Sequence, residues 1–129
     1  MEPPKAVTSL MKYFHLESTA LKDNVADLPE YVKVCQLSDI PTSSMLPFDL
    51  GENHLMIVNV EGTLYAVDRI CTHETADLST GFLIDSEVTC PLHLSRFDVT
   101  NGTVKNSPAT RPLRTYKLRV EGTTVYVRL

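Results

Sequence analysis

Two short segments of the sequence each carry one cysteine and one histidine, in the same order. The first is Cys71-Thr-His73, and the second, after sixteen intervening residues, is Cys90-Pro-Leu-His93. Thiolates and imidazoles bind zinc and iron, and a cysteine close to a histidine is also a pair used in nucleophilic catalysis. The repeated order therefore points to a metal centre, a catalytic pair or ordinary loop residues.

The order of the candidate ligands favours a binuclear iron centre over a structural zinc site. Zinc sites with two cysteines and two histidines usually have one cysteine pair and a separate histidine pair. Here each segment mixes the two types, which suits a Rieske-type [2Fe–2S] cluster, with both thiolates on one iron and both imidazoles on the other. Zinc and catalysis remain alternatives, although the sequence offers a cysteine nucleophile no recognisable orienting partner or oxyanion hole.

A hairpin is expected to bring the two segments together. Asp85-Ser86 separates two short apolar stretches, as a tight turn would. In an extended segment residues i and i+2 lie on the same side, so Cys71 and His73 can face the second segment together. Two loops, residues 71–76 and 90–96, would then each present one thiolate and one imidazole.

The chain from Tyr31 onward predicts an all-β sandwich or barrel. Residues 54–60 and 63–67 are rich in apolar, β-branched and aromatic residues, and only Glu61-Gly62 separates them, which is a hairpin signal. Asn101-Gly102 and residues 121–122 repeat this turn chemistry. Short strands joined by such turns are typical of all-β domains.

Residues 1–30 have a different pattern and predict a helical arm that packs on the domain and ends near Pro29. Their apolar residues recur mostly at steps of three and four, as on one side of a helix. These apolar positions are Val7, Leu10, Met11, Phe14, Leu21, Val25 and Leu28.

Length and composition are those of a single cytoplasmic domain. The chain has 129 residues and a net charge of −4, so it lacks the basic excess of nucleic-acid binders. No apolar run is long enough to span a membrane. Three cysteines argue against a disulfide framework, and Cys35, without a neighbouring histidine, is expected to be a reduced core thiol.

One local stretch departs from this acidic balance. Between Val99 and Val120 the sequence has five cations and no acid. This stretch is either a solvated strand face or a docking patch for an acidic partner. The five cations are Lys105, Arg111, Arg114, Lys117 and Arg119.

From about Tyr31 to Leu129 the chain resembles the Rieske-type ferredoxins. The resemblance is carried by the motifs CTHE, DLSTGF, CPLH, RFDVTNG and PATRPL. It implies a Rieske-like β-sandwich over residues 31–129 with a two-loop cluster-binding subdomain, preceded by the arm of residues 1–30. It also implies a third loop around Pro108 that covers one side of the cluster.

The resemblance further implies one [2Fe–2S] cluster per chain and a role for each candidate ligand. Cys71 and Cys90 would bind the inner iron. His73 and His93 would bind the outer iron, with their free ring nitrogens near the surface. His15 and His54 lie outside both loops and are interpreted as surface or packing residues.

Several positions depart from the pattern of the respiratory Rieske proteins. Those proteins carry an extra cysteine in each loop, whereas Ala76 and Leu92 stand here, so the disulfide between the loops cannot form. Ser95 occupies the position of a serine that bonds to the cluster, but Phe97 replaces a tyrosine, which predicts a low to intermediate reduction potential. Leu94 stands where a glycine often follows the last histidine; either its backbone is strained or the loop takes another path and Leu94 shields the cluster.

The implied function is one-electron transfer rather than catalysis. The resemblance suggests a flavin-dependent reductase as donor and an oxygenase or similar enzyme as acceptor. The alternative is the redox small subunit of a larger oxidoreductase, such as an assimilatory nitrite reductase. Glu74, Asp77 and Arg96 are expected to flank the exposed histidines, either as docking charges or as solvated loop charges.

Overall fold

A computed structural model describes residues 28–129, so the helical arm expected over residues 1–30 falls almost entirely outside the described part of the chain. Residues 28–129 form nine strands and two short 3-10 helices, which confirms the all-β prediction. In chain order they are β1 (Tyr31–Gln36), η3 (Leu37–Asp39), β2 (Met45–Leu50), β3 (Asn53–Val60), β4 (Thr63–Asp68), η4 (Leu78–Thr80), β5 (Phe82–Ile84), β6 (Glu87–Thr89), β7 (Arg96–Asp98), β8 (Thr115–Glu121) and β9 (Thr124–Arg128).

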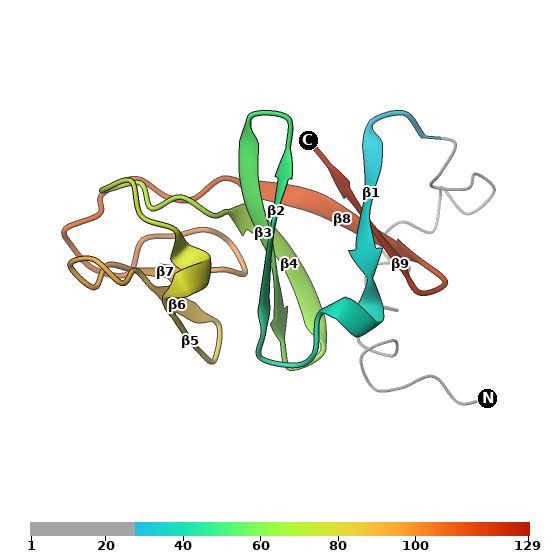
Figure 1. Ribbon diagram of the computed structural model, residues 1–129. Coiled ribbons are helices and arrows are strands. Elements are labelled where there is room, and N and C mark those ends of the chain that lie inside the picture. The colour runs from blue at the N-terminus through green and yellow to red at the C-terminus, as the bar shows by residue number, and fades with distance from the viewer. Residues whose placement is uncertain (1–27) are drawn as a thin grey trace.

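The strands form a main sheet and a small second sheet, which lie side by side in Figure 1. The six-stranded sheet has the order β1-β9-β8-β4-β3-β2, and the three-stranded sheet has the order β5-β6-β7. All the pairings between these strands are antiparallel. The β5–β6 hairpin of the small sheet lies between the two predicted ligand loops in sequence and is therefore the element that brings them together.

Strand β3 connects the two halves of the molecule because both of its faces are buried. Successive side chains of a strand point to opposite faces. Leu55 and Ile57 pack into a core that all six strands of the main sheet share. Met56 and Val58 pack into a second core formed with the small sheet and the predicted ligand loops. The second core fixes the ligand loops to the main sheet.

The predicted turns are present, with one difference. Glu61 and Gly62 both have positive φ, at 52° and 95°, between the paired strands β3 and β4. Asp85 also has positive φ, in the turn between β5 and β6. After Asn101-Gly102, however, the chain returns beside β7 through a single bridge, Phe97 to Val104, and forms no further strand.

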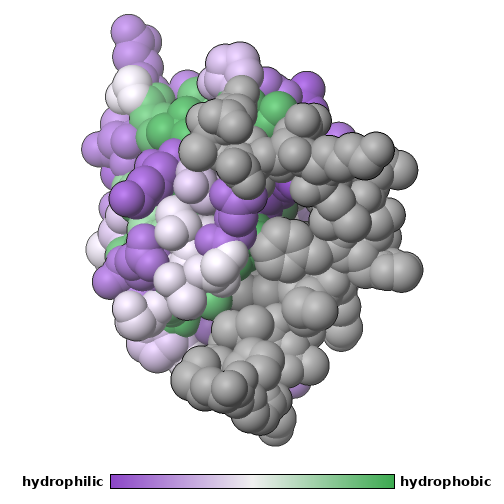
Figure 2. Space-filling view, turned by 90° about the vertical axis from the view of Figure 1, so that its right-hand side faces the viewer, coloured by the Kyte–Doolittle hydropathy of each residue, from purple (hydrophilic) through white to green (hydrophobic). Residues whose placement is uncertain are grey.

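No helix in the described residues is long and apolar enough to cross a bilayer. Figure 2 shows the end of the molecule opposite the small sheet, where the visible described residues are mostly hydrophilic or neutral and apolar atoms form smaller groups.

We predict that Gly102→Ala destabilises the protein more than Gly51→Ala. Both glycines have positive φ, at 81° and 62°, which disfavours alanine by roughly 1 kcal/mol. A Cβ at Gly102 would lie 2.3 Å from the Leu113 carbonyl oxygen, whereas one at Gly51 would meet nothing within 4 Å. Thermal unfolding should show a clearly larger fall in midpoint for Gly102→Ala, and equal falls would contradict the close packing described.

Candidate metal centre

Each of the two predicted ligand loops is closed by a backbone hydrogen bond of the same kind. The Cys71 N–H donates to the Ala76 carbonyl at 2.9 Å, and the Cys90 N–H donates to the Ser95 carbonyl at 2.7 Å. In each loop the cysteine therefore bonds to the residue five positions later, and its histidine lies within the closed turn. The sequence repeat thus corresponds to a repeat of local structure.

The structure separates the four candidate ligands into a buried pair and a more exposed pair. The cysteines are 5% and 0% exposed and belong to the core beneath the small sheet. The side chains of His73 and His93 are 30% and 57% exposed. Their rings lie edge to face, with centroids 5.4 Å apart. Sulfur donors thus lie on the protein side and nitrogen donors on the solvent side.

Glu74 lies between the two histidines. Its Oε2 atom is 2.9 Å from Nδ1 of His93 and 3.8 Å from Nδ1 of His73. Two histidines and a carboxylate could hold a mononuclear iron, and ligand atoms of these three residues lie within 4.8 Å of one another. Such a site would leave two buried thiols without a role, whereas a binuclear centre uses all four mirrored groups. The complete donor set therefore fits a [2Fe–2S] cluster better.

The surroundings of Cys90 argue against catalysis by a cysteine nucleophile. Burial is the main cause that raises the pKa of the Cys90 thiol above its ordinary value, and the neighbouring Cys71 thiol raises it further. A reactive cysteine needs the opposite shift, because the thiolate is the nucleophile. Bound metal cations would supply the positive charge that stabilises a thiolate here.

A third segment, residues 106–111, bonds to both ligand loops. The Asn106 side chain accepts the Arg96 N–H at 2.6 Å, beside the second loop. The Thr72 hydroxyl donates to the Arg111 carbonyl at 2.6 Å, in the first loop. The Ser107–Pro108 peptide bond within this segment is cis. The third loop predicted around Pro108 therefore lies against both ligand loops.

Sequence reasoning did not identify Arg69, which links the first loop to the main sheet. Its guanidinium donates to the carbonyls of Phe48 and Leu55 and forms ion pairs with Asp49 at 3.0 Å and Asp77 at 3.1 Å. The only sequence signal was the proximity of Arg69 to Cys71, and none indicated its distant partners. Asp77 is thus bound to Arg69 rather than being a free charge.

The other two charges expected near the histidines differ in their contacts. Arg96 forms an ion pair with Glu87 at 3.2 Å, so part of its charge is compensated within the small sheet. Glu74 is the one that contacts the histidines directly. His54 lies outside the loops, half-exposed and bonded to Asp49, as its interpretation as a surface residue predicts. Cys35 is only partly buried, and burial raises its pKa to about 12.

Ser95 provides a direct test of whether the site fits an iron–sulfur cluster. It is completely buried, and its Oγ accepts the Ala109 N–H at 3.0 Å. Among residues 28–129 this is the hydrogen bond that the Ser95 side chain forms, and in it the hydroxyl acts as acceptor and keeps its proton. A buried hydroxyl that still has a proton to donate, on the loop that carries Cys90, matches the need of cluster sulfurs for hydrogen bonds. Phe97 is also completely buried but brings no hydroxyl.

The structure decides between the two expectations for Leu94. Leu94 has φ of 61°, and His93 before it has φ of 63°, so both residues adopt the left-handed conformation that glycine tolerates best. The Leu94 side chain is 58% exposed. It therefore has a strained backbone and contributes little to burying the centre.

We predict that Leu94→Gly raises the thermal midpoint of the metal-loaded protein by a few degrees. Glycine removes a backbone strain of roughly 1 kcal/mol, and such a change shifts the midpoint of a domain of this size by about 4–8 °C. Leu92→Gly is the matched control: Leu92 is similarly exposed but does not have positive φ. This control should lower the midpoint, and a decrease in both variants would refute the strain assignment.

Comparisons with known proteins point to the same kind of cofactor. The profile of the Rieske [2Fe-2S] domain matches residues 30–117. The chain is 37% identical over 100 residues to the ferredoxin component of the naphthalene 1,2-dioxygenase system of Pseudomonas aeruginosa. The aligned residues cover 78% of this chain and 96% of that protein.

Solved structures show the same fold. A chain in the complex of reduced oxygenase and oxidized ferredoxin of carbazole 1,9a-dioxygenase is 33% identical, with a TM-score of 0.73, covering 77% of this chain and 93% of that chain. A putative small subunit of NADPH nitrite reductase has a TM-score of 0.67 but is 21% identical, covering 77% of this chain and 98% of that chain. The second likeness shows the fold alone.

Proposed function

The chain belongs to the Rieske [2Fe-2S] domain family, and we propose that it carries electrons to an oxygenase through a cluster held by Cys71, His73, Cys90 and His93. The assignment of residues 31–129 as one Rieske domain, with the β-sandwich and two-loop subdomain of the family, is part of this proposal. The observation that supports it most strongly is the pair of identically closed loops, with thiols buried and imidazoles exposed.

The four side chains have different roles. A Rieske cluster takes up and releases one electron. Cys71 and Cys90 would hold the inner iron within the core, where both side chains are buried. His73 and His93 would hold the outer iron and, because they are exposed, provide the contact through which a partner exchanges electrons. The ligand set is neutral on the histidine side, which keeps the negative charge of the centre low.

The partners follow from the relatives. The related chains are ferredoxin components of dioxygenase systems, and one was solved in complex with its oxygenase. The acceptor of this chain is therefore proposed to be the oxygenase component of such a system. The donor is proposed to be a flavin-dependent reductase in the same cytoplasmic system, because a one-electron carrier needs a source that can supply electrons singly.

The runner-up function is the small subunit of a nitrite reductase. Its support is a likeness of fold without close sequence identity. The ferredoxin component of the naphthalene 1,2-dioxygenase system shares 37% of the aligned residues over 96% of its length. The free-standing carrier is therefore the better supported function, and stable co-purification with a large subunit would favour the runner-up.

We predict that His93→Ala abolishes cluster binding whereas His54→Ala preserves it. The wild-type chain should contain two irons and two acid-labile sulfides, and His93→Ala should contain neither in stoichiometric amount. His54 is a matched control because it is a half-exposed histidine outside both loops. Circular dichroism should show that both variants retain the β-structure, and a full cluster in His93→Ala would refute the ligand assignment.

We predict that Ser95→Ala lowers the reduction potential by up to about 130 mV. A hydrogen bond to a charged group is worth about 1.5–3 kcal/mol, and about 1.4 kcal/mol corresponds to 59 mV for one electron. Ser86→Ala removes a hydroxyl in the β5–β6 turn and should leave the potential unchanged. Protein-film voltammetry should place the wild type in the lower part of the roughly −150 to +300 mV Rieske range. A wild-type value above about +200 mV, or no shift in Ser95→Ala, would contradict the assignment.

A further inference from the structure

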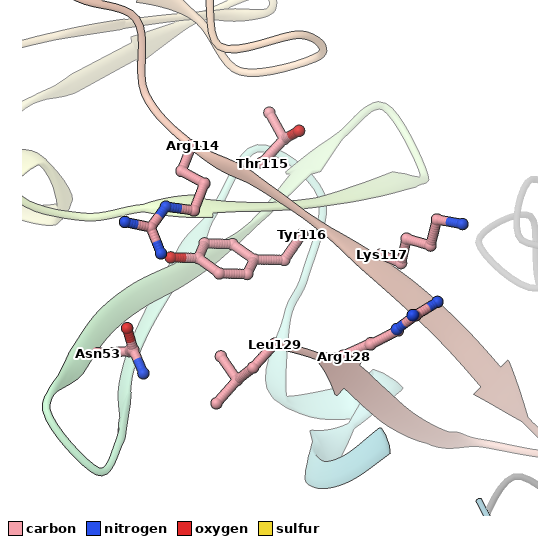
Figure 3. A pocket seen from close by; sticks show the side chains of 7 residues that line it. All are labelled: Asn53, Arg114, Thr115, Tyr116, Lys117, Arg128 and Leu129. Atoms are coloured by element: carbon pink, nitrogen blue, oxygen red, sulfur yellow. The ribbon is translucent and has the colours of Figure 1, made fainter. Parts of the chain in front are cut away.

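A hollow of about 400 Å³ lies on the main sheet, outside both ligand loops (Figure 3). Its walls come from the start of β3, from β8 with the residue before it, and from the end of β9. None of these elements belongs to the small sheet. The lining residues are Asn53, Arg114, Thr115, Tyr116, Lys117, Arg128 and Leu129.

The side chains that line this hollow carry three positive charges, and two of these charges have no carboxylate partner among the described residues. Three of the seven are cations and none is an acid. Lys117 and Arg128 are direct partners across β8 and β9, and like charges in this position repel each other. Within residues 28–129 neither forms an ion pair with a carboxylate. This arrangement is unfavourable in the isolated domain and would become favourable with an anion bound.

Arg114 is held at the other side of the hollow by Tyr116. The Arg114 guanidinium carbon lies 5.9 Å from the centre of the Tyr116 ring. Tyr116 in turn donates its hydroxyl hydrogen to Asp68. Burial, and then this bond to Asp68, raise the pKa of Tyr116 to about 12, so the phenol stays neutral. Asp68 also accepts the Arg114 backbone N–H. Asp68 therefore offsets part of the charge of Arg114, while the Arg114 side chain remains exposed to a partner.

The three positive charges of the hollow lie in two separate groups. Figure 3 shows the Arg114 guanidinium beside the Tyr116 hydroxyl, whereas Lys117 and Arg128 extend together toward the opposite side. All three cations are exposed. A small free anion would reach one of these places and remain largely hydrated there. A chain with several carboxylates could reach both, and the surrounding contacts of a protein would add to its affinity.

We propose that this hollow docks an acidic segment of a protein partner, with one carboxylate at Arg114 and another at Lys117 and Arg128. The basic stretch between Val99 and Val120 thereby contributes a docking site through its last part, rather than only a solvated strand face. The inference rests on the proposed function only in assigning the segment to a redox partner. A contact here leaves the exposed histidines accessible, because none of the lining residues belongs to the ligand loops.

The test is a titration of the full chain, as purified, with a hexaglutamate peptide, followed by ¹H–¹⁵N spectra. Hexaglutamine is the uncharged control. The amide signals of Thr115, Lys117 and Leu129 should shift with hexaglutamate only. Lys117→Gln and Arg128→Gln should each weaken binding about two- to fivefold, as expected for exposed ion pairs.

Lys105→Gln is the matched control variant, because Lys105 is an exposed cation of the same basic stretch but does not line the hollow. It removes the same charge and should leave the affinity unchanged. Equal weakening by Lys105→Gln, shifts elsewhere on the surface, or no binding would overturn the proposal. The proposal would also be overturned if inorganic phosphate shifted the same amide signals with an affinity equal to that of the peptide, since the site would then be one for small anions.

The electron paramagnetic resonance spectrum of the same samples after reduction separates this proposal from the proposed function. Peptide binding at the hollow without a Rieske signal would leave the docking site standing and refute the electron carrier. A Rieske signal without peptide binding would do the reverse.

Discussion

The candidate centre depends on two backbone hydrogen bonds, from Cys71 to Ala76 and from Cys90 to Ser95. Each bond closes a loop at its cysteine, so that the thiol points into the core and the histidine two or three positions later lies nearer to solvent. A cluster with sulfur ligands on one iron and nitrogen ligands on the other needs this division. The asymmetry of the metal site is thus a consequence of how two short loops close after the ends of β4 and β6.

The rest of the fold holds these two loops in fixed positions. The proposed cysteine ligands are members of a hydrophobic core that includes β3, β6 and β7, so burial of apolar surface and placement of the thiols occur together. Arg69 ties the first loop to the main sheet, and residues 106–111 bond to both loops. The strained backbone of Leu94 persists because the structure around it is specified by many other contacts. An electron carrier benefits from this rigidity, because little rearrangement is then needed when its charge changes.

The sequence predicted the features that depend on local chemistry. The ligand spacing, the turns at Glu61-Gly62 and Asp85-Ser86 and the strand character of residues 54–60 are set by neighbouring residues, and the structure contains these turns and this strand. The contacts of Arg69 and residues 106–111 could not be predicted, since they join residues 8 to 39 positions apart that only the folded sheets bring together. The backbone conformation of Leu94 could not be predicted either. A leucine permits several backbone conformations, and the hydrogen bond that closes the second loop selects one of them. After Asn101-Gly102 the chain pairs with β7 only at the bridge from Phe97 to Val104. The carbonyl of Gly102 instead accepts the N–H of Leu113, just before β8.

The central claim is that two imidazoles and two thiolates share one binuclear iron centre. Pulsed electron paramagnetic resonance of the dithionite-reduced protein tests it most directly, because it detects both the electron spin and the nitrogens coupled to it. The account predicts a signal of low average g value with hyperfine coupling to two directly bound nitrogens. A reduced protein without any such signal, as with zinc, or with a cluster signal that lacks nitrogen coupling, would contradict it.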